Sequence, residues 1–308
     1  MSAEPALRPA ASDLWTQPHL TPAIAPESVA WDRVESATYR IDQRFFYEYP
    51  GPIANLRHRL VVSPPRRHGA QERLARRLSL APHVPTERAT DAFGNDVVTI
   101  DVPHVESSFD VTFASLVQTR ALATTHYVAA VPLSLHQPAG LTACDDAMRE
   151  TAYEMRRSYD DDEARARAIS SYAYRRITYT KDVTDVGTTA IQAFHFRRGV
   201  CQDLAHVALA LGRAAGLACR YVSGHLLGEG GTHAWVEFLI PEESGAGRRT
   251  RVLALDPTHD RDVTMRYVVV AVGRDYEDVP PTSGAYDAPY CGTFTARHAV
   301  TIARVTYA

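Results

Sequence analysis

The stretch that decides the fold begins a helix and carries a thiol: residues 198–216 read RGVCQDLAHVALALGRAAG. From Cys201 onward the apolar residues recur at spacings of three and four, which predicts a helix that packs one face on a core. Gly212 and Gly216 lie near the expected end of that helix. Cys201 is therefore expected at the helix N-terminus, on the buried face.

A cysteine at the start of a helix is a candidate nucleophile. The unpaired N–H groups and the partial positive charge of a helix N-terminus favour thiolate over thiol, and the same groups can donate to an oxyanion. A lone cysteine is more often an inert buried thiol, and we interpret Cys144, Cys219 and Cys291 in that way. Only its position distinguishes Cys201 from those three.

Two residues that can complete such a site follow in the chain, each at the end of a predicted strand. His233 opens the extended segment 233–240, and Asp256 directly follows the apolar run of 252–255. A histidine can take the proton of a thiol, and a carboxylate can orient the histidine. Cysteine, histidine and aspartate in this order predict a thiol-dependent acyl-transfer site.

The pairing of these two strands determines whether the histidine meets the aspartate. The polar segment 241–249 can turn the chain back, and if Leu239 pairs with Thr250, counting places His233 opposite Asp256. Opposed Cβ atoms in such a ladder lie about 4.5–5.5 Å apart, which lets a carboxylate orient an imidazole. Alternation gives the first strand a core-facing side with Ala234, Val236 and Phe238 and another with His233, Trp235 and Glu237.

A metal site is the rival interpretation of the histidines. The residues that would have to combine are His206, His225, His259, His233, Glu237 and Cys201. No pair among them has the H-E-x-x-H or C-x-x-C spacing of a zinc site, so we expect no metal. The glycines Gly228, Gly230 and Gly231 lack the strand-to-helix context of a phosphate cradle, and we expect them to let the loop before His233 move or admit substrate.

The chain divides into a lead-in, a β-rich part and a mixed part. Residues 1–30 contain five prolines and no sustained period, which predicts a flexible lead-in. Residues 31–130 contain β-prone runs separated by turn signals and predict a β-sandwich domain. Residues 131–159 predict a linker, and residues 160–308 predict an α+β catalytic domain with a central helix on an antiparallel sheet. Strands are expected at 38–49, in a run after the turn at 50–52 that ends at 62, and at 97–102, 109–113, 218–222, 233–240 and 251–255. Helices are expected at 160–176 and 188–196, and a third helix begins at 201.

Composition limits the class of protein and its surroundings. A length of 308 residues gives room for about two domains. The net charge of −3 gives no electrostatic reason to expect a nucleic acid or an anionic membrane as partner. The four cysteines are scattered, residues 1–28 do not resemble a signal peptide, and no apolar run approaches the roughly 20 residues of a membrane span. We expect a cytoplasmic protein of unknown oligomeric state.

Four ordered segments resemble the core of the bacterial transglutaminase-like superfamily: GVCQDLAH at 199–206, RYVSG at 220–224, HAWVE at 233–237 and DPT at 256–258. The segment AVGRDYEDVPP at 271–281 resembles the tail of one bacterial branch. Residues 36–120 are similar to the β-rich N-terminal domain of that branch. The resemblance implies a papain-like core fold, no cofactor, and chemistry on amide or ester carbonyls.

The resemblance also implies roles for single residues. Cys201 would be the nucleophile, His233 the base and acid, and Asp256 the group that orients His233. His259 stands where the family pattern has asparagine, which leaves its role open.

The oxyanion donor departs from the family pattern as well. No tryptophan occurs in the few dozen residues before Cys201, whereas animal-type transglutaminases use one to stabilise the oxyanion. Tyr179, Gln202 and Trp235 are the candidates for contacting the substrate or its oxyanion. This departure weakens the case for protein cross-linking specifically.

An acyl-enzyme of this kind passes its acyl group to water or to an amine, and the sequence leaves both open. We favour hydrolysis by a cysteine peptidase or amidase, because water needs no second binding site. Transamidation is the alternative. A catalytically silent peptide-binding module is a further one, although such a module has no physical need for all three groups. The expected partner is a peptide or protein amide substrate.

Overall fold

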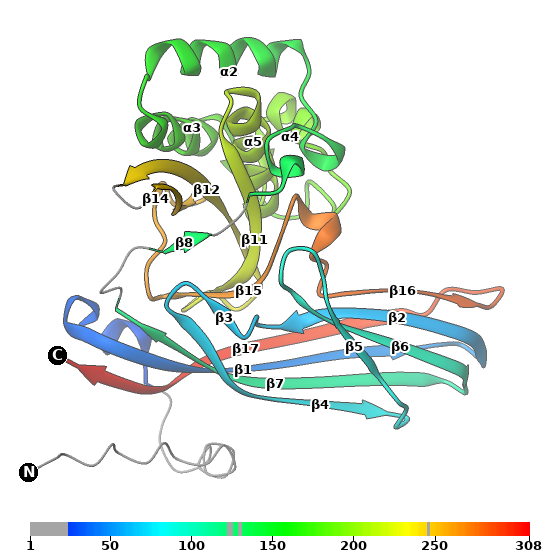
Figure 1. The fold of residues 1–308 in the computed structure, drawn as a ribbon. Helices are drawn as coiled ribbons and strands as arrows, with labels where there is room; N and C mark the ends of the chain where they lie inside the picture. Colours follow the sequence, from blue (N-terminus) through cyan, green and yellow to red (C-terminus); the bar gives the residue numbers. More distant parts are fainter. Residues whose placement is uncertain (1–23, 122–125, 129–130, 245–246) are drawn as a thin grey trace, which may run out of the picture.

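Two antiparallel sheets of β-prone, alternating sequence pack face to face and form a sandwich (Figure 1). The computed structural model describes residues 24–121, 126–128, 131–244 and 247–308. One sheet has the order β17 (Thr293–Tyr307), β1 (Val34–Glu48), β7 (Ser108–Arg120), β4 (Gln71–Ala81) and β3 (Arg67–His68). The other has the order β16 (Thr282–Asp287), β2 (Ile53–Ser63), β6 (Asp96–Val105) and β5 (Glu87–Thr90). The predicted β-sandwich is confirmed.

The sandwich is held together by large apolar side chains between its sheets. Phe45, Leu60, Ile100, Phe109 and Phe113 are all buried in one cluster. Removing a side chain of this size from water stabilises the fold by roughly 1.5–3 kcal/mol. Phe45, Ile100, Phe109 and Phe113 alternate with more exposed neighbours, which is the pattern that predicts their strands.

The last strands of the chain belong to the sandwich and not to the part of the molecule that follows it in the sequence. β17 pairs with β1 along its length, and β16 pairs with β2. The expectation that 160–308 forms the catalytic domain by itself is therefore wrong at its C-terminal end. A β-prone run does not reveal which sheet it joins, and here β17 covers an edge of β1 that would otherwise be open.

The second part of the molecule, here called the core, is another sheet covered by helices. Its order is β14 (Arg261–Asp262), β13 (Gly247–Asp256), β12 (His233–Ser244), β11 (Ala218–Leu226) and β15 (Tyr267–Gly273), and β8 (Tyr127–Val128) pairs with β13. The helices are α2 (Asp146–Ser158), α3 (Asp162–Arg176), α4 (Ala190–Phe196) and α5 (Cys201–Ala214). β9 (Thr178–Tyr179) and β10 (Arg198–Gly199) form a short parallel pair. The core sheet lies between the helices and the sandwich (Figure 1). No helix of the described residues is long and apolar enough to cross a membrane.

The expected linker and lead-in are more ordered than predicted. Within 131–159, α2 buries Met148 and Ala152 against α5 and its neighbours, so this segment is part of the core and not a linker. The Asp145 carboxylate accepts a hydrogen bond from Met148 N at 2.9 Å and caps the helix. Residues 1–23 of the expected lead-in lie outside the described residues, whereas residues 24–30 lie against the sandwich.

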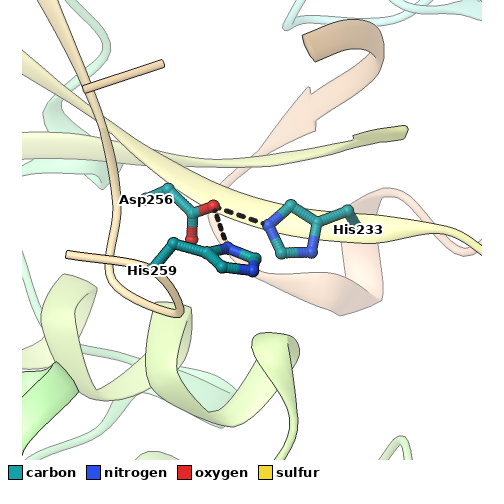
Figure 2. Close-up of side chains that lie close together, drawn as sticks. All are labelled: His233, Asp256 and His259. Atoms are coloured by element: carbon teal, nitrogen blue, oxygen red, sulfur yellow. Dashed lines mark hydrogen bonds and ion pairs between the residues drawn. The ribbon is translucent and has the colours of Figure 1, made fainter. Parts of the chain in front are cut away.

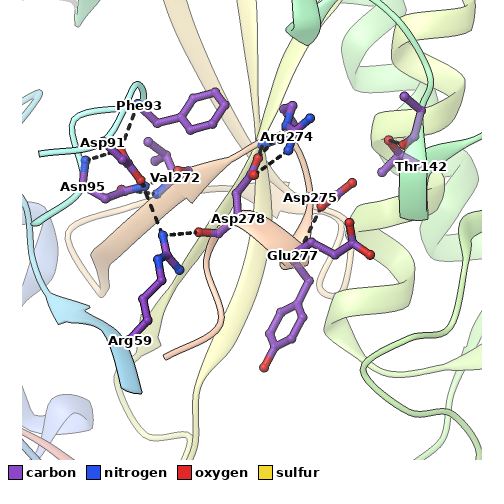
Figure 3. A network of polar contacts seen from close by, with 12 residues as sticks. Arg59, Asp91, Phe93, Asn95, Thr142, Val272, Arg274, Asp275, Glu277 and Asp278 are labelled. Atoms are coloured by element: carbon purple, nitrogen blue, oxygen red, sulfur yellow. Dashed lines mark hydrogen bonds and ion pairs between the residues drawn. The ribbon is translucent and has the colours of Figure 1, made fainter. Parts of the chain in front are cut away.

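Two side-chain amides fasten the sandwich to the edge strand of the core sheet. Gln71 Nε2 donates to Val269 O and Gln71 Oε1 accepts from Val269 N, both at 2.8 Å. Asn95 does the same with Val272 at 2.7 and 2.9 Å, as Figure 3 shows. Each amide satisfies one donor and one acceptor that the last strand of a sheet would leave unpaired. The turn at 91–95 between β5 and β6 thus also makes an interdomain contact.

Charged groups add to this contact. Arg59 on β2 donates to Asp278 O at 3.3 Å and lies 4.0 Å from the Asp91 carboxylate (Figure 3). Arg274 pairs with the Asp278 carboxylate at 2.7 Å. The segment 271–281 therefore docks the core on the sandwich.

Candidate active site

The nucleophile candidate Cys201 is the first residue of α5, and a buried carboxylate fixes that helix start. Asp203 Oδ2 accepts from Val200 N at 2.7 Å and from Thr184 Oγ1 at 2.8 Å. A Cβ at position 199 would lie 2.5 Å from the same oxygen, so Gly199 is required for this close approach. The predicted helix N-terminus at Cys201 is confirmed.

The helix behind Cys201 is buried on nearly all sides. Residues 204–211 are all buried, because the sheet lies against one face of α5 and the helices α2, α3 and α4 pack around the rest. His206 is among them, and its Nε2 accepts from Tyr276 N at 3.2 Å. A helix held this rigidly positions its first residue well.

His233 and Asp256 lie in direct contact. Nε2 of His233 is 2.8 Å from Oδ2 of Asp256, and the two side chains are 2% and 0% exposed. The other ring nitrogen, Nδ1, is not used by Asp256, and Cys201 lies close enough to His233 to raise the pKa of the imidazole. The structure thus brings together the three residues expected from the sequence.

The strand register differs from the expected one by two residues. Val236 pairs with Leu255, which places Asp256 opposite Trp235 and not opposite His233. The connection is shorter than expected because both strands continue through the polar residues expected to form the loop. A shift of two residues keeps the same strand face. His233 and Asp256 are therefore diagonal neighbours and still meet.

Asp256 is saturated with hydrogen-bond donors. Its Oδ2 also accepts from Tyr267 Oη at 2.7 Å and bonds Nδ1 of His259 at 2.8 Å, and its Oδ1 accepts from Thr258 N at 2.8 Å. Figure 2 shows both imidazoles directed at this carboxylate. Burial raises the pKa of Asp256, but the hydrogen bond and charge of His233 and the hydrogen bonds of Tyr267 and His259 outweigh burial and hold that pKa well below its usual range.

The charge of Asp256 acts on His233 in return. Burial alone would lower the pKa of His233, but the hydrogen bonds and charges of Asp256 and Cys201 raise it to about 10. An imidazolium is therefore stable beside the sulfur at neutral pH. Such a pair is the active form of a thiol nucleophile.

Comparison with known proteins shows the family to which the chain belongs. Residues 149–246 match the family model of the transglutaminase-like superfamily, and residues 39–118 match that of the bacterial transglutaminase-like N-terminal region. An uncharacterized protein of Mycobacterium tuberculosis is 32% identical over 277 residues, which cover 80% of this chain and 86% of that protein. The chain belongs to the bacterial transglutaminase-like superfamily.

Two further relatives span most of this superfamily member. An uncharacterized protein of Mycobacterium leprae is 30% identical over 264 residues, covering 79% of this chain and 90% of that protein. A crystal structure from Cytophaga hutchinsonii, named a "putative cysteine protease", aligns with a TM-score of 0.71 at 20% identity, over 89% of this chain and 93% of that one. At this identity the likeness shows the fold, a papain-like core with a β-rich N-terminal domain.

Beside His233 in this transglutaminase-like core lies a carboxylate that the sequence did not single out. Glu229 Oε2 lies 3.5 Å from Nδ1 of His233, and Oε1 lies 3.1 Å from Nε2 of His259. Its side chain is 43% exposed, on the glycine loop that begins with Gly228 at a φ of +90°. His259, whose role the sequence left open, connects Glu229 to Asp256.

The three candidates for substrate contact have different outcomes. The prediction that Trp235 contacts the substrate is wrong, because this side chain is fully buried in a cluster with Tyr267. Gln202 Nε2 already donates to Val186 O at 3.0 Å. Tyr179 is half exposed, and burial, together with the charges of Cys201 and Glu229, raises its pKa. Its role as an oxyanion donor stays a prediction.

Two of the histidines weighed as metal ligands, His206 and His225, make their contacts elsewhere in the fold. His225 Nδ1 contacts Gly231 O at 3.3 Å, away from His206 in the helix. Ligand atoms of His233, Asp256 and His259 do lie within 4.8 Å of one another and could hold an ion. Both imidazoles, however, lie 2.8 Å from the same carboxylate oxygen, which is the separation of hydrogen-bond partners.

The other cysteines lack these surroundings. Burial raises the pKa of Cys144 and of Cys219 to about 11, which disfavours their thiolates. Cys291 is exposed and free. Cys201 is the cysteine that combines partial exposure with a histidine partner.

Two contributors to the site carried no visible signal in the sequence. Tyr267 begins an apolar strand, where a tyrosine is an ordinary core residue. Glu229 stands between glycines, where an acid is an ordinary loop residue. Their contacts with Asp256 and His233 depend on the fold of segments that the local pattern does not place.

Proposed function

We propose that this protein is a cysteine peptidase or amidase that cleaves a peptide or protein amide through Cys201, His233 and Asp256. The observation that carries the proposal is the buried hydrogen bond between His233 and Asp256 beside a thiol at a helix N-terminus. Structural thiols do not need a buried, charge-stabilised imidazole. Family membership supports the same reaction class.

The reaction would proceed in two halves. The Cys201 thiolate attacks the carbonyl carbon, and the first N–H groups of α5, which have no carbonyl one turn back in the helix, donate to the oxyanion. The C–N bond breaks, and His233 gives its proton to the departing amine. Water then attacks the thioester, His233 takes a proton from that water, and the carboxylic acid leaves with Cys201 restored. Asp256 holds the imidazole in one tautomer throughout.

Transamidation is the second candidate, and Glu229 favours it. This half-exposed carboxylate lies beside His233, where a cationic amine acceptor would approach the thioester. An amine in place of water would yield a new amide by the same steps. Hydrolysis stays the first candidate because it requires no acceptor site.

Alkylation by iodoacetamide tests the nucleophile. Cys201 should react much faster than Cys144 or Cys219 near neutral pH, because thiolate fraction and access control the rate. Cys291 is a matched control, since it is exposed but has no histidine partner among the described residues. Equal labelling of Cys201 and Cys291 by peptide mapping would remove the nucleophile assignment and favour a silent binding module.

The reaction type is tested by the products. A library of γ-glutamyl and peptidyl amides should be incubated with the protein, with and without an added primary amine. Release of free carboxylic acid that is unaffected by the amine supports hydrolysis. Formation of the amine adduct at the expense of the acid supports transamidation, and no turnover of any amide by a protein with a fast Cys201 would contradict both.

A further inference from the structure

A cavity of about 690 Å³ lies between the sandwich and the core sheet, away from the catalytic thiol. It is lined from the core by Glu237, Val252 and Ala254, which share the strand face opposite α5. Sites for small molecules in proteins commonly have volumes of about 300–1,000 Å³ and occur at domain interfaces. The cavity therefore has the size and the location of a ligand site.

Most of the cavity wall is apolar. The residues that contribute apolar or aromatic surface are Trp31, Val252, Val263, Met265, Tyr267 and Val269. The amide clasp of Gln71 on Val269 forms part of the same wall and holds it closed. An occupant would therefore bury an aliphatic or aromatic body.

The most deeply buried charge in the cavity wall is already neutralised. Glu237 accepts from His68 Nε2 at 2.6 Å and from both Nε and Nη2 of Arg220 at 2.7 and 2.6 Å. Burial lowers the pKa of His126, which also lines the cavity, to about 4, so this ring adds no charge at neutral pH. This cluster leaves no uncompensated charge for a ligand.

Two arginines in the wall, by contrast, have no carboxylate partner within the part of the chain that the structure describes. Arg120 reaches only the Gln118 side-chain oxygen, at 3.4 Å. Arg266 reaches only Leu227 O, at 3.5 Å, and its Nε is buried without a partner. The exposed Asp32 contributes the one opposing charge. Two cations and one anion leave a single positive charge.

We propose that the cavity binds a small organic monocarboxylate with an aliphatic or aromatic body, whose carboxylate is held by Arg120 and Arg266. Guanidinium groups bind a carboxylate through charge-assisted hydrogen bonds, and the buried Nε of Arg266 would gain the acceptor that it lacks. The apolar wall would take the body of the molecule. A molecule of this kind matches the cavity in net charge and in polarity.

The site is linked to the catalytic residues through one side chain. The ring of Tyr267 lines the cavity, and its hydroxyl donates to Asp256 Oδ2 at 2.7 Å and accepts from Arg261 Nε at 2.8 Å. An occupant packed on this ring would change turnover by changing how firmly Asp256 is held. That consequence rests on the proposed function, whereas binding itself does not.

Calorimetric titration of the full chain with 4-phenylbutyrate and with 4-phenylbutan-1-ol tests the proposal. The acid should bind at one site and at least about tenfold more tightly than the alcohol, because only the acid can pair with the arginines. The double variant Arg120→Gln/Arg266→Gln should lose about that factor for the acid and keep the affinity for the alcohol. Arg57→Gln, an exposed arginine on β2, is the matched control and should bind as the native chain does.

Several outcomes would overturn the proposal. These are equal affinity for acid and alcohol, unchanged affinity in the double variant, and no saturable binding of the acid. If the double variant does not fold, Arg120→Gln alone makes the same comparison, because this side chain is exposed. Binding of the acid without fast alkylation of Cys201 would contradict the proposed function and leave the cavity site standing. Fast alkylation of Cys201 without binding of the acid would contradict the cavity site and leave the proposed function standing.

Discussion

Asp256 and Glu237 are buried carboxylates of the core sheet that each contact an imidazole, and of these two imidazoles His233 is the one near a thiol at a helix start. Asp256 lies 2.8 Å from His233, and Glu237 lies 2.6 Å from His68. Both carboxylates are buried, and charged or hydrogen-bonded neighbours hold the pKa of each well below its usual range despite burial. The two pairs are similar in distance, in burial and in charge.

The two pairs differ in the second contact that each imidazole makes. His233 lies near Cys201 at the start of α5, whose sulfur helps to raise the pKa of this imidazole. His68 belongs to the sandwich and packs edge-on against His126, and Glu237 is already neutralised by Arg220. A buried carboxylate–histidine pair is therefore a catalytic element only beside a nucleophile. Without one it fastens two domains together.

Removing the nucleophile should have the largest effect. In Cys201→Ala no thioester can form, so turnover of any amide should fall to the uncatalysed rate. The change opens no large cavity, and the melting temperature should stay close to that of the native chain. Cys144→Ala is the control and should keep full turnover, since its sulfur donates only to Ala210 O. Residual thioester chemistry in Cys201→Ala would assign the reaction to another residue.

The carboxylate of the catalytic pair should come second. Asp256→Asn keeps the size of the side chain but removes the charge that supports the His233 imidazolium, so turnover should fall by roughly 10²–10⁴. Turnover and thermal melting of this variant should be measured together. Full activity would mean that another acid orients His233, and unfolding would mean that Asp256 is structural.

The corresponding change in the other pair should affect stability and spare the chemistry. Glu237→Gln leaves Arg220 buried without its anion, and breaking a buried ion pair costs about 3–5 kcal/mol of unfolding free energy. Turnover at a temperature where the variant is folded should change only a few-fold. Denaturant unfolding and turnover, measured on the same sample, distinguish the two pairs. A loss of turnover as large as that of Asp256→Asn would make the pairs equivalent and contradict the comparison.

The sequence predicted the local parts of this site better than their arrangement. Cys201, His233 and Asp256 each carry a local signal, since each stands at the end of a regular element. The register between β12 and β13 was wrong by two residues, yet the pair still forms because alternation preserves the strand face.

What depends on distant segments was not predictable. The pairing of β17 with β1 and the bonds from Tyr267 to Asp256 and from His68 to Glu237 join residues far apart in the chain. Trp235 was misjudged for a related reason. Alternation places it on the face of His233, but only the packing of the sandwich on that face shows that it is buried.

The pH dependence of stability should test the charges of the His233–Asp256 pair. The pKa of His233 is raised to about 10, so its contribution to stability is fully present below about pH 6.5 and is lost as the pH rises towards 10. Asp256 has a lowered pKa, so its contribution is present above about pH 4 and is lost as the pH falls further. The stability difference between the native chain and Asp256→Asn should therefore be largest near pH 6 and shrink towards pH 10. A difference that is constant from pH 6 to pH 10 in denaturant unfolding would contradict a charged His233.

The smallest effect is expected from Glu229, the acid that approaches His233 from the solvent side. Because this side chain is 43% exposed and its Oε2 is 3.5 Å from Nδ1, solvent screens its charge, and Glu229→Gln should change amide hydrolysis by less than about tenfold. A cationic acceptor would still sense the loss, so the KM for a diamine should rise several-fold. The KM for hydroxylamine, which is uncharged at neutral pH, should stay the same. Glu35→Gln on the exposed side of β1 is the matched control and should alter neither acceptor. Equal changes for the charged and the uncharged amine would show that Glu229 shapes the loop and does not recognise charge.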